Sequence, residues 1–193
     1  MRTVPLAGWH TAVSLWRLDI ASELIFVGDA GSTQASRPSA RRGIEWSNVW
    51  SPVRDVSVDA DYTISRARFS DSNPAGNLIP GAMARTLSVG ATAGAATGWQ
   101  AGARLRYFGP RPLVADGSER AASSTLVNLK AGYVFDKRQS LSLDVINVFN
   151  RRANDIEYYY ASRLAGEAAA VSDRHVHPLE PRTVRVSLRV PLD

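Results

Sequence analysis

The sequence contains no cysteine, and this absence removes several kinds of site at once. A chain without thiols can form no disulfide, no cysteine metal site and no covalent intermediate on sulfur. Long apolar runs are missing too, since no stretch approaches the roughly 18 consecutive apolar residues of a membrane-spanning helix. The N-terminal segment 1–23 is interrupted by Pro5, His10 and Arg17 and lacks a clear cleavage site. We therefore expect any export signal to lie outside this chain, or Met1 not to be the natural start.

Blocks of like charge are also missing. Lys and Arg number 23 and Asp and Glu number 18, and they are scattered along the chain at a net charge of +5. Nucleic-acid binding needs a clustered basic surface, so we expect no nucleic-acid partner. No Gly-rich phosphate loop, nucleophile elbow or His-Glu-x-x-His pair is present. The sequence accordingly predicts neither an enzyme nor a bound cofactor.

Strict alternation of apolar and polar residues is what the sequence does contain. In segment 55–65 the even positions are apolar from Val56 to Ile64, while the odd positions are polar. Segment 182–192 alternates in the same way, with Val184, Val186 and Leu188 set against arginine and serine. This period of two predicts strands with one apolar and one polar face.

Seven weaker segments have the same character, which gives about nine predicted strands and no convincing helix. They are 8–17, 22–29, 42–51, 85–95, 98–108, 124–135 and 140–149. Most are near ten residues long, whereas strands of soluble proteins average about 5–6. A tilted strand that crosses a bilayer needs roughly 9–11 residues. We therefore interpret these segments as membrane-spanning strands.

The predicted connections alternate between short and long. Short connections fall at 19–22, 51–55, 95–98 and 136–138, and long polar ones at 29–41, 69–84, 109–123 and 151–181. Antiparallel membrane barrels have short periplasmic turns and longer extracellular loops. The sequence thus predicts an all-β fold, an antiparallel up-and-down transmembrane β-barrel that is only partial.

Aromatic residues gather beside the short connections. Trp50, Trp99, Tyr133 and Phe135 fall there on the apolar face, where an interfacial girdle would sit, although Tyr62 lies in mid-strand. Aromatics in the core of a soluble sandwich are the alternative interpretation.

The polar faces carry many charges. They include Glu45, Asp59, Asp61, Arg104, Arg106, Lys130, Asp144, Arg185 and Arg189. Burying these groups in a sandwich core would cost several kcal/mol each unless they were paired, so a wet lumen suits them better. If residues 136–138 form a hairpin loop, Lys130 faces Asp144 and Leu129 faces Val145. Such an ion pair would contribute about 0.2–1 kcal/mol.

Three stretches resemble one known family. The run "SLSLDVINVFNRR" followed by "DIEYYYASR" resembles the penultimate strand and loop of TonB-dependent outer-membrane receptors. The end of the chain, "EPRTVRVSLRVPL", is similar to their closing strand. "SLWRLDIASELIFVGDAG" followed by "RRGIEWSNVW" is similar to an earlier part of their barrel. The terminal Pro191-Leu192-Asp193 departs from the aromatic end common in outer-membrane barrels.

The resemblance implies that residues 1–193 are the C-terminal portion of a receptor barrel. Such receptors resemble a roughly 22-stranded barrel plugged by an N-terminal domain, and the plug and the first strands are absent here. The resemblance implies the outer membrane of a Gram-negative bacterium, with lipid around the barrel. It also implies uptake of a scarce nutrient, such as a siderophore, cobalamin or carbohydrate, at the long loops. Contact with the TonB system would involve only the missing N-terminal parts.

Two loop features could carry binding chemistry. Asp173, His175, His177 and Glu180 lie close together in the sequence, and imidazole with carboxylate can bind zinc or iron. A solvated loop or a strand-entry feature explains them better, so His175 and His177 are only weak metal candidates. The run 157–160, Glu-Tyr-Tyr-Tyr, is either a ligand-stacking platform or a loop-packing cluster, and we favour the second.

Two other functions remain open from the sequence. One is a small autonomous outer-membrane pore or adhesin, which an even strand count and an export signal would favour. The other is a soluble β-sandwich binding module, in which the apolar strand faces would pack into a protein core.

Overall fold

The computed structural model describes residues 2–3, 7–22, 24–27, 32–136 and 139–190. These residues form fifteen strands, from β1 to β15, joined by turns and loops. No helix of the described residues is long and apolar enough to cross a membrane. The chain terminus 191–193 and part of the predicted turn 136–138 lie outside the described residues.

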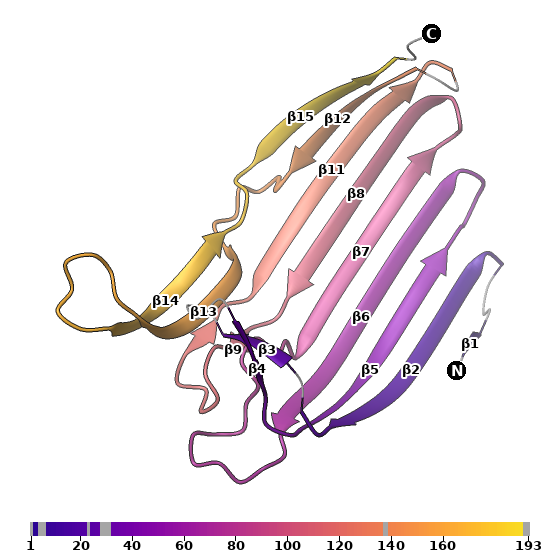
Figure 1. The fold of residues 1–193 in the computed structure, drawn as a ribbon. Helices are drawn as coiled ribbons and strands as arrows, with labels where there is room; N and C mark the ends of the chain where they lie inside the picture. Colours follow the sequence, from indigo (N-terminus) through magenta and orange to yellow (C-terminus); the bar gives the residue numbers. More distant parts are fainter. Residues whose placement is uncertain (1, 4–6, 23, 28–31, 137–138, 191–193) are drawn as a thin grey trace.

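One sheet of nine strands dominates the structure (Figure 1). Its order is β1-β2-β5-β6-β7-β8-β11-β12-β15, and every neighbouring pair is antiparallel. Figure 1 shows it as a curved sheet with β2 towards one edge and β15 at the other. The strands are β1 (Arg2–Thr3), β2 (Trp9–Ile20), β5 (Ser39–Trp50), β6 (Val56–Phe69), β7 (Arg85–Gly94), β8 (Gly98–Phe108), β11 (Ser124–Val134), β12 (Ser140–Ile146) and β15 (Thr183–Arg189).

Eight of the nine predicted strands lie in this sheet, and the predicted strand 22–29 does not. Among the described residues of this segment, Leu24–Val27 form β3, which pairs with β4 (Ser32–Ala35) in a separate two-stranded hairpin. The predicted short turn at 19–22 is therefore wrong. β2 continues to Ile20 and pairs directly with β5 over its whole length, which leaves no place for a strand between them.

Long and short connections still alternate after this correction. The long connections are 21–38, 70–84, 109–123 and 147–182, and three of them contain a small hairpin. These hairpins are β3–β4, β9 (Arg111–Pro112) with β10 (Arg120–Ala121), and β13 (Asn154–Ser162) with β14 (Val171–Pro178). Figure 1 shows β3, β4, β9, β13 and β14 at the same end of the sheet, which we name the loop end.

The register aligns the alternating apolar positions of neighbouring strands on one surface, which we name the apolar face. One row runs from Val58 through Ala91, Ala103 and Leu129 to Val145, and then to Val184. The neighbouring row on the apolar face contains Ala131, Leu143 and Val186. Because side chains alternate along a strand, the residues between these positions form the opposite, polar face.

Aromatic side chains form a belt at the short-turn end of the apolar face. Trp9 lies opposite Trp50 and Trp99 opposite Tyr133. The Tyr133 ring packs edge-on against Trp99 at a centroid distance of 5.2 Å and against Phe135 at 4.9 Å. The predicted position of these aromatics is therefore confirmed. Since Trp99 is 75% exposed, this belt is not part of a packed protein core.

Asn147 fixes the place where β12 ends and the last long loop begins. Its φ of 51° lies in the left-handed region, which asparagine tolerates better than most residues. The buried side chain donates from Nδ2 to the carbonyls of Arg151 and Glu180, and its Oδ1 accepts from the Arg151 amide. The Asn147 amide donates to Asn128 on β11. This one residue thus ties β11, the loop and the start of β15 together.

We predict that Asn147→Ala lowers the free energy of unfolding by about 2–4 kcal/mol, because it leaves buried backbone groups without partners. Urea unfolding followed by tryptophan fluorescence measures this change. Asn150→Ala is the matched control: Asn150 has a similar φ of 49° but is exposed and accepts from the Arg182 amide. An equal loss in both variants would contradict the role given to Asn147.

Candidate functional site

The polar face carries an ion pair across three strands. Arg104 of β8 donates to both carboxylate oxygens of Asp59 on β6, at 3.0 and 2.9 Å, and to Ser88 Oγ on β7 at 2.9 Å. β7 lies between the paired strands and has Gly90 at the crossing point. A Cβ at Gly90 would lie 2.5 Å from both the Arg104 and the Asp59 side chains. Glycine at this position makes room for the ion pair.

A second charged row crosses β11, β12 and β15. Lys130 lies opposite Asp144, and Asp144 lies opposite Arg185. The Lys130 Nζ and Asp144 Oδ1 atoms are 3.9 Å apart. Leu129 faces Val145 on the apolar face. The register predicted from the 136–138 turn, with Lys130 opposite Asp144 and Leu129 opposite Val145, is therefore confirmed.

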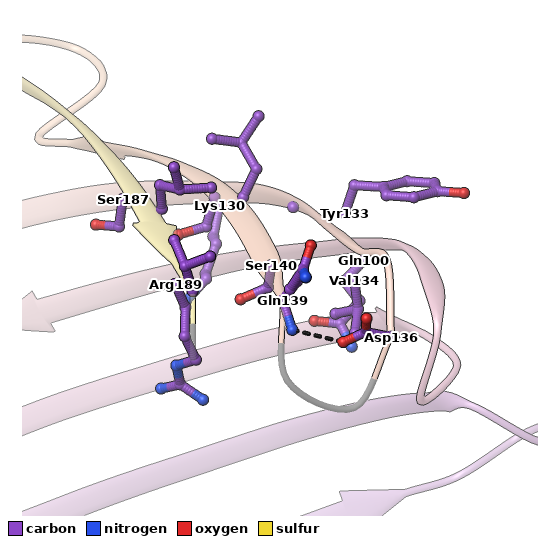
Figure 2. Close-up of a pocket in the computed structure, with 14 residues that line it drawn as sticks. Gln100, Lys130, Tyr133, Val134, Asp136, Gln139, Ser140, Ser187 and Arg189 are labelled. Carbon is purple, nitrogen blue, oxygen red and sulfur yellow. Dashed lines mark hydrogen bonds between the residues drawn. The ribbon is translucent and has the colours of Figure 1, made fainter. Parts of the chain in front are cut away.

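The polar face remains hydrophilic as far as the short-turn end. A hollow of about 640 Å³ lies there, and its lining residues come mainly from β8, β11, β12 and β15. Figure 2 shows these residues as sticks. Gln100, Lys130, Ser187 and Arg189 are among its lining residues. The carboxylate of Asp136 accepts from the Gln139 amide at 2.7 Å and closes the turn beside it. The hollow is thus a continuation of the charged polar face.

The best-buried apolar side chains lie at the loop end. Among the described residues they are Phe69, Ile79, Leu113, Ala121 and Leu126. Two backbone hydrogen bonds join the loops that contribute to this cluster: the Leu78 amide donates to Ala115, and the Gly81 amide donates to Pro112. The loops 70–84 and 109–123 therefore form one packed unit on the end of the sheet.

A buttressed ion pair connects the first long loop to this unit. Arg37 contacts both Asp71 carboxylate oxygens, with Nη2 to Oδ1 at 2.6 Å and Nε to Oδ2 at 2.8 Å. Arg37 also donates to the Gly76 carbonyl, and its guanidinium lies 4.3 Å from the centre of the Phe69 ring. The hydrogen bonds from Arg37 hold the pKa of the Asp71 carboxyl below its usual value. The pair is therefore fully charged at neutral pH.

The β13–β14 hairpin brings two of the predicted residues together. The rings of Tyr160 and His175 are stacked at a centroid distance of 3.8 Å. His177 lies opposite Ile156, one pair further along the hairpin. Within the described residues no group of three or more His, Asp and Glu side chains could hold a metal ion. The Tyr-rich run is thus divided, because Tyr158 and Tyr160 share a face with His175 while Tyr159 points to the other side.

Two contacts hold this hairpin against the rest of the loops. Arg174 donates from Nη2 to Glu119 Oε2 at 2.6 Å, and the same guanidinium lies 3.8 Å from Glu157. The buried Arg111 on β9 donates to the Asp155 carbonyl. The last two long loops are therefore fastened together by charge.

Sequence reasoning located the loops and missed the contacts between them. Arg37 with Asp71 and Arg174 with Glu119 are separated by 34 and 55 residues. Alternation and strand length carry no information about which loop residues meet at that separation. No signal in the sequence alone identifies these pairs.

The chain thus belongs to the all-β class: it is a curved antiparallel sheet with one apolar face, one charged face and packed loops at one end. A family model for the TonB-dependent receptor-like β-barrel matches residues 5–148. The chain therefore belongs to the TonB-dependent receptor family.

Solved structures of larger proteins share the fold. The closed form of the ferric-catecholate import receptor Fiu from E. coli matches with a TM-score of 0.71 at 19% identity, over 97% of this chain and 26% of Fiu. The unliganded ferric citrate transporter FecA matches with a TM-score of 0.70 at 15% identity, over 95% of this chain and 29% of FecA. The copper transporter OprC matches with a TM-score of 0.67 at 16% identity, over 96% of this chain and 29% of OprC.

The chain thus spans little more than a quarter of each of these proteins. Their names include two iron complexes and copper, so the shared fold does not fix a cargo. No curated protein gives a significant sequence match.

We predict that Asp71→Asn loosens loop 70–84 at neutral pH, because it removes the charge that Arg37 binds. A carboxyl whose pKa is lower in the folded state than in the unfolded state stabilises the fold when the pH is above the unfolded-state pKa. This stabilisation is lost as the pH falls through the folded-state pKa. Wild type and Asp71→Asn should therefore converge well below pH 3.8. Hydrogen exchange of residues 70–84, corrected for its intrinsic pH dependence, measures this.

Asp116→Asn is the control for this experiment. The Ser118 amide and hydroxyl donate to Asp116 and lower the pKa of its carboxyl. Both residues belong to loop 109–123, so these hydrogen bonds do not connect two loops. Equal exchange in Asp71→Asn and wild type at neutral pH would contradict the role of the Arg37–Asp71 pair.

Proposed function

We propose that this chain forms part of the wall of a nutrient transporter in the outer membrane of a Gram-negative bacterium. The apolar face contacts lipid, and the polar face lines the interior of the barrel. The observation that carries the proposal is the exposure of large apolar side chains on one face of the sheet. On β15 alone, Val184, Val186 and Leu188 are 61–68% exposed.

Water is a poor surrounding for such a surface. Contiguous exposed apolar patches of more than a few hundred Å² are rare in soluble monomers and mark interaction or membrane surfaces. A soluble sandwich would have to cover the apolar face with a second layer, and the described residues leave its side chains exposed. Lipid can cover the same surface without leaving backbone N–H and C=O groups unpaired, because these groups form hydrogen bonds between neighbouring strands of the sheet.

The charged face fits an aqueous or protein-filled interior. Its ion pairs are partly exposed, with the Arg104 and Asp59 side chains 43% and 28% accessible. Charges on the lumen side of a barrel are tolerated, whereas charges on the lipid side destabilise it. An autonomous pore or adhesin would share this wall, and the family match favours a receptor over both.

The rest of the transporter lies outside this chain in our proposal. Residues 1–193 form the C-terminal portion of the barrel, and further polypeptide supplies the other strands and the plug. Energy transfer from the TonB system would pass through those parts. This division agrees with the share of Fiu, FecA and OprC that the chain covers.

The packed loops at the loop end are the surface that we propose for capture of the cargo. They are fastened by Arg37–Asp71 and Arg174–Glu119, so they present a preformed surface rather than loose segments. A preformed surface loses less conformational entropy when it binds. The cargo belongs to the siderophore, cobalamin or carbohydrate class in this proposal, and the function is transport rather than catalysis.

Substitution of arginine at either of two adjacent residues of β12 tests whether the apolar face contacts lipid. We predict that Leu143→Arg, on the apolar face, lowers barrel stability by about 2–4 kcal/mol. Ser142→Arg, on the polar face, should have little effect. The measurement is the fraction of the receptor containing this chain that reaches the folded, heat-modifiable form in outer membranes. Equal assembly of both variants would contradict a lipid-facing apolar surface.

Uptake tests the loop surface. Arg174→Gln frees the β13–β14 hairpin from Glu119 and should reduce uptake without reducing assembly. Radiolabelled iron as ferric citrate or as a ferric catecholate complex, radiolabelled cobalamin and a radiolabelled oligosaccharide are the probes, which cover the three proposed cargo classes. Arg163→Gln is the control, since within the described part of the chain its side chain donates to the Glu167 carbonyl of its own loop and makes no contact with another loop. Uptake of no probe by wild type, or equal uptake by Arg174→Gln and wild type, would count against the proposed loop surface.

A further inference from the structure

The two faces of the β13–β14 hairpin have different surroundings. Among the described residues the hairpin is a two-stranded sheet of its own. One face carries Arg174, whose Nη2 donates to Glu119 Oε2 of loop 109–123 at 2.6 Å and which lies 3.8 Å from Glu157. The Glu157 side chain is only 8% exposed. We name this side the packed face, because contact with the neighbouring loop explains it.

The opposite side of the hairpin, which we name the free face, presents rings and apolar side chains outward. Its members alternate along the two strands with those of the packed face. They are Ile156, Tyr158, Tyr160 and Ser162 of β13, which lie opposite His177, His175, Asp173 and Val171 of β14. Ile156, Tyr158 and Val171 are 44%, 42% and 51% exposed. Packing against a neighbouring loop thus explains one face of the Tyr-rich run and leaves the other without an explanation.

Three rings on the free face lie side by side. The rings of Tyr160 and His175 are stacked at a centroid distance of 3.8 Å, with 3° between their planes. Tyr158 lies directly opposite His175, and facing residues of an antiparallel pair have Cβ atoms about 4.5–5.5 Å apart. We name Tyr158, Tyr160 and His175 the aromatic platform. Such side chains supply a large contact area and lose little conformational entropy when a ligand binds.

The charge of the free face limits the ligands that it suits. Asp173 is its one carboxylate, and none of its residues is an arginine or a lysine. One oxygen of Asp173 accepts from the Arg174 amide at 2.7 Å, and the residue stays exposed. Ferric citrate and ferric catecholate complexes are anionic, and proteins bind such oxygens mainly with arginine and lysine. The free face therefore disfavours anionic iron chelates.

A neutral sugar matches both the rings and the charge of the free face. The face of an aromatic ring is electron-rich, so the weakly positive C–H groups on one side of a pyranose ring can lie flat against it. The hydroxyl groups at the edge of the sugar can donate to the Asp173 carboxylate and form a hydrogen bond with the exposed His177 imidazole. A neutral sugar also brings no negative charge next to Asp173.

We propose that the free face binds neutral oligosaccharides, with a sugar ring on the aromatic platform and hydroxyl groups on Asp173 and His177. This inference rests on the proposed function, because it names the cargo class that the loop end captures. The contact between Arg174 and Glu119 lies behind the platform and holds the hairpin in place. The platform is therefore preformed, which lowers the entropy lost on binding.

Isothermal titration calorimetry of the purified receptor that contains this chain tests the proposal, in a detergent without a sugar head group. The probes are neutral hexasaccharides of glucose, mannose, xylose and galactose, with hexagalacturonate as the anionic comparison. We expect at least one neutral probe to bind at least about tenfold more tightly than hexagalacturonate, a difference of roughly 1.4 kcal/mol. Ferric citrate and cobalamin should not displace the bound sugar.

Variants locate the site on one face of the hairpin. Tyr158→Ala with Tyr160→Ala should lose about tenfold in affinity for the neutral sugar, and Tyr158→Phe with Tyr160→Phe should lose less because the rings remain. Tyr159→Ala is the matched control, since Tyr159 lies between them on the packed face, and it should bind like wild type. Asp173→Lys leaves the rings in place and should strengthen binding of hexagalacturonate. Heat-modifiable migration confirms that each variant is folded.

Three results would overturn the proposal. They are binding of none of the neutral probes, equal binding by wild type and the Tyr158→Ala/Tyr160→Ala variant, and displacement of the sugar by ferric citrate or cobalamin, which would assign the platform to another cargo class. Failure of the proposed function has a different signature. In that case Leu143→Arg and Ser142→Arg assemble equally well, or the purified receptor binds the sugar while cells take up no cargo.

Discussion

The antiparallel register that runs unbroken from β2 to β15 is the constraint on which the other features depend. Side chains alternate with a period of two, so one slip between neighbouring strands would exchange the two faces beyond that point. The register holds Asp59 beside Arg104 and Lys130 beside Asp144 on one face. It aligns Leu129, Val145 and Val184 on the other. The register thus gives the sheet one apolar face and one charged face from β2 to β15.

Much of the fold could be predicted because apolar and polar residues alternate along the strand segments of the sequence. The segments 55–65 and 182–192, and the pairing of Lys130 with Asp144, need only the period and one turn. The segment 22–29 misled the prediction because a short apolar run favours a strand without saying which sheet it joins. Its neighbour β2 pairs directly with β5, and the run becomes one arm of a small loop hairpin. Which strand pairs with β2 depends on the strands available elsewhere in the chain. A local apolar pattern carries no information about that choice.

The loop contacts show the limit of sequence reasoning at the candidate site. The stretch 157–160 is conspicuous in the sequence, yet strand parity separates Tyr159 from Tyr158 and Tyr160. Arg37 and Asp71, which are inconspicuous, form the ion pair that joins two loops. Asn147 was partly predictable. Its place in "VINVFN" suggested a family, but only its left-handed backbone and buried side-chain amide explain why asparagine occupies this position. Packing at the loop end depends on contacts between segments that are far apart in the sequence.

The central claim is that lipid covers one face of the sheet and not the other. The chain has no cysteine, so single cysteines can carry a fluorescent label without background. We would place labels at Val58 and Ala60 on the apolar face of β6 and at Ser57 and Thr63 on its polar face, in the receptor reconstituted with brominated lipids. The account predicts strong quenching at Val58 and Ala60 and weak quenching at Ser57 and Thr63. Equal quenching at all four positions would contradict it.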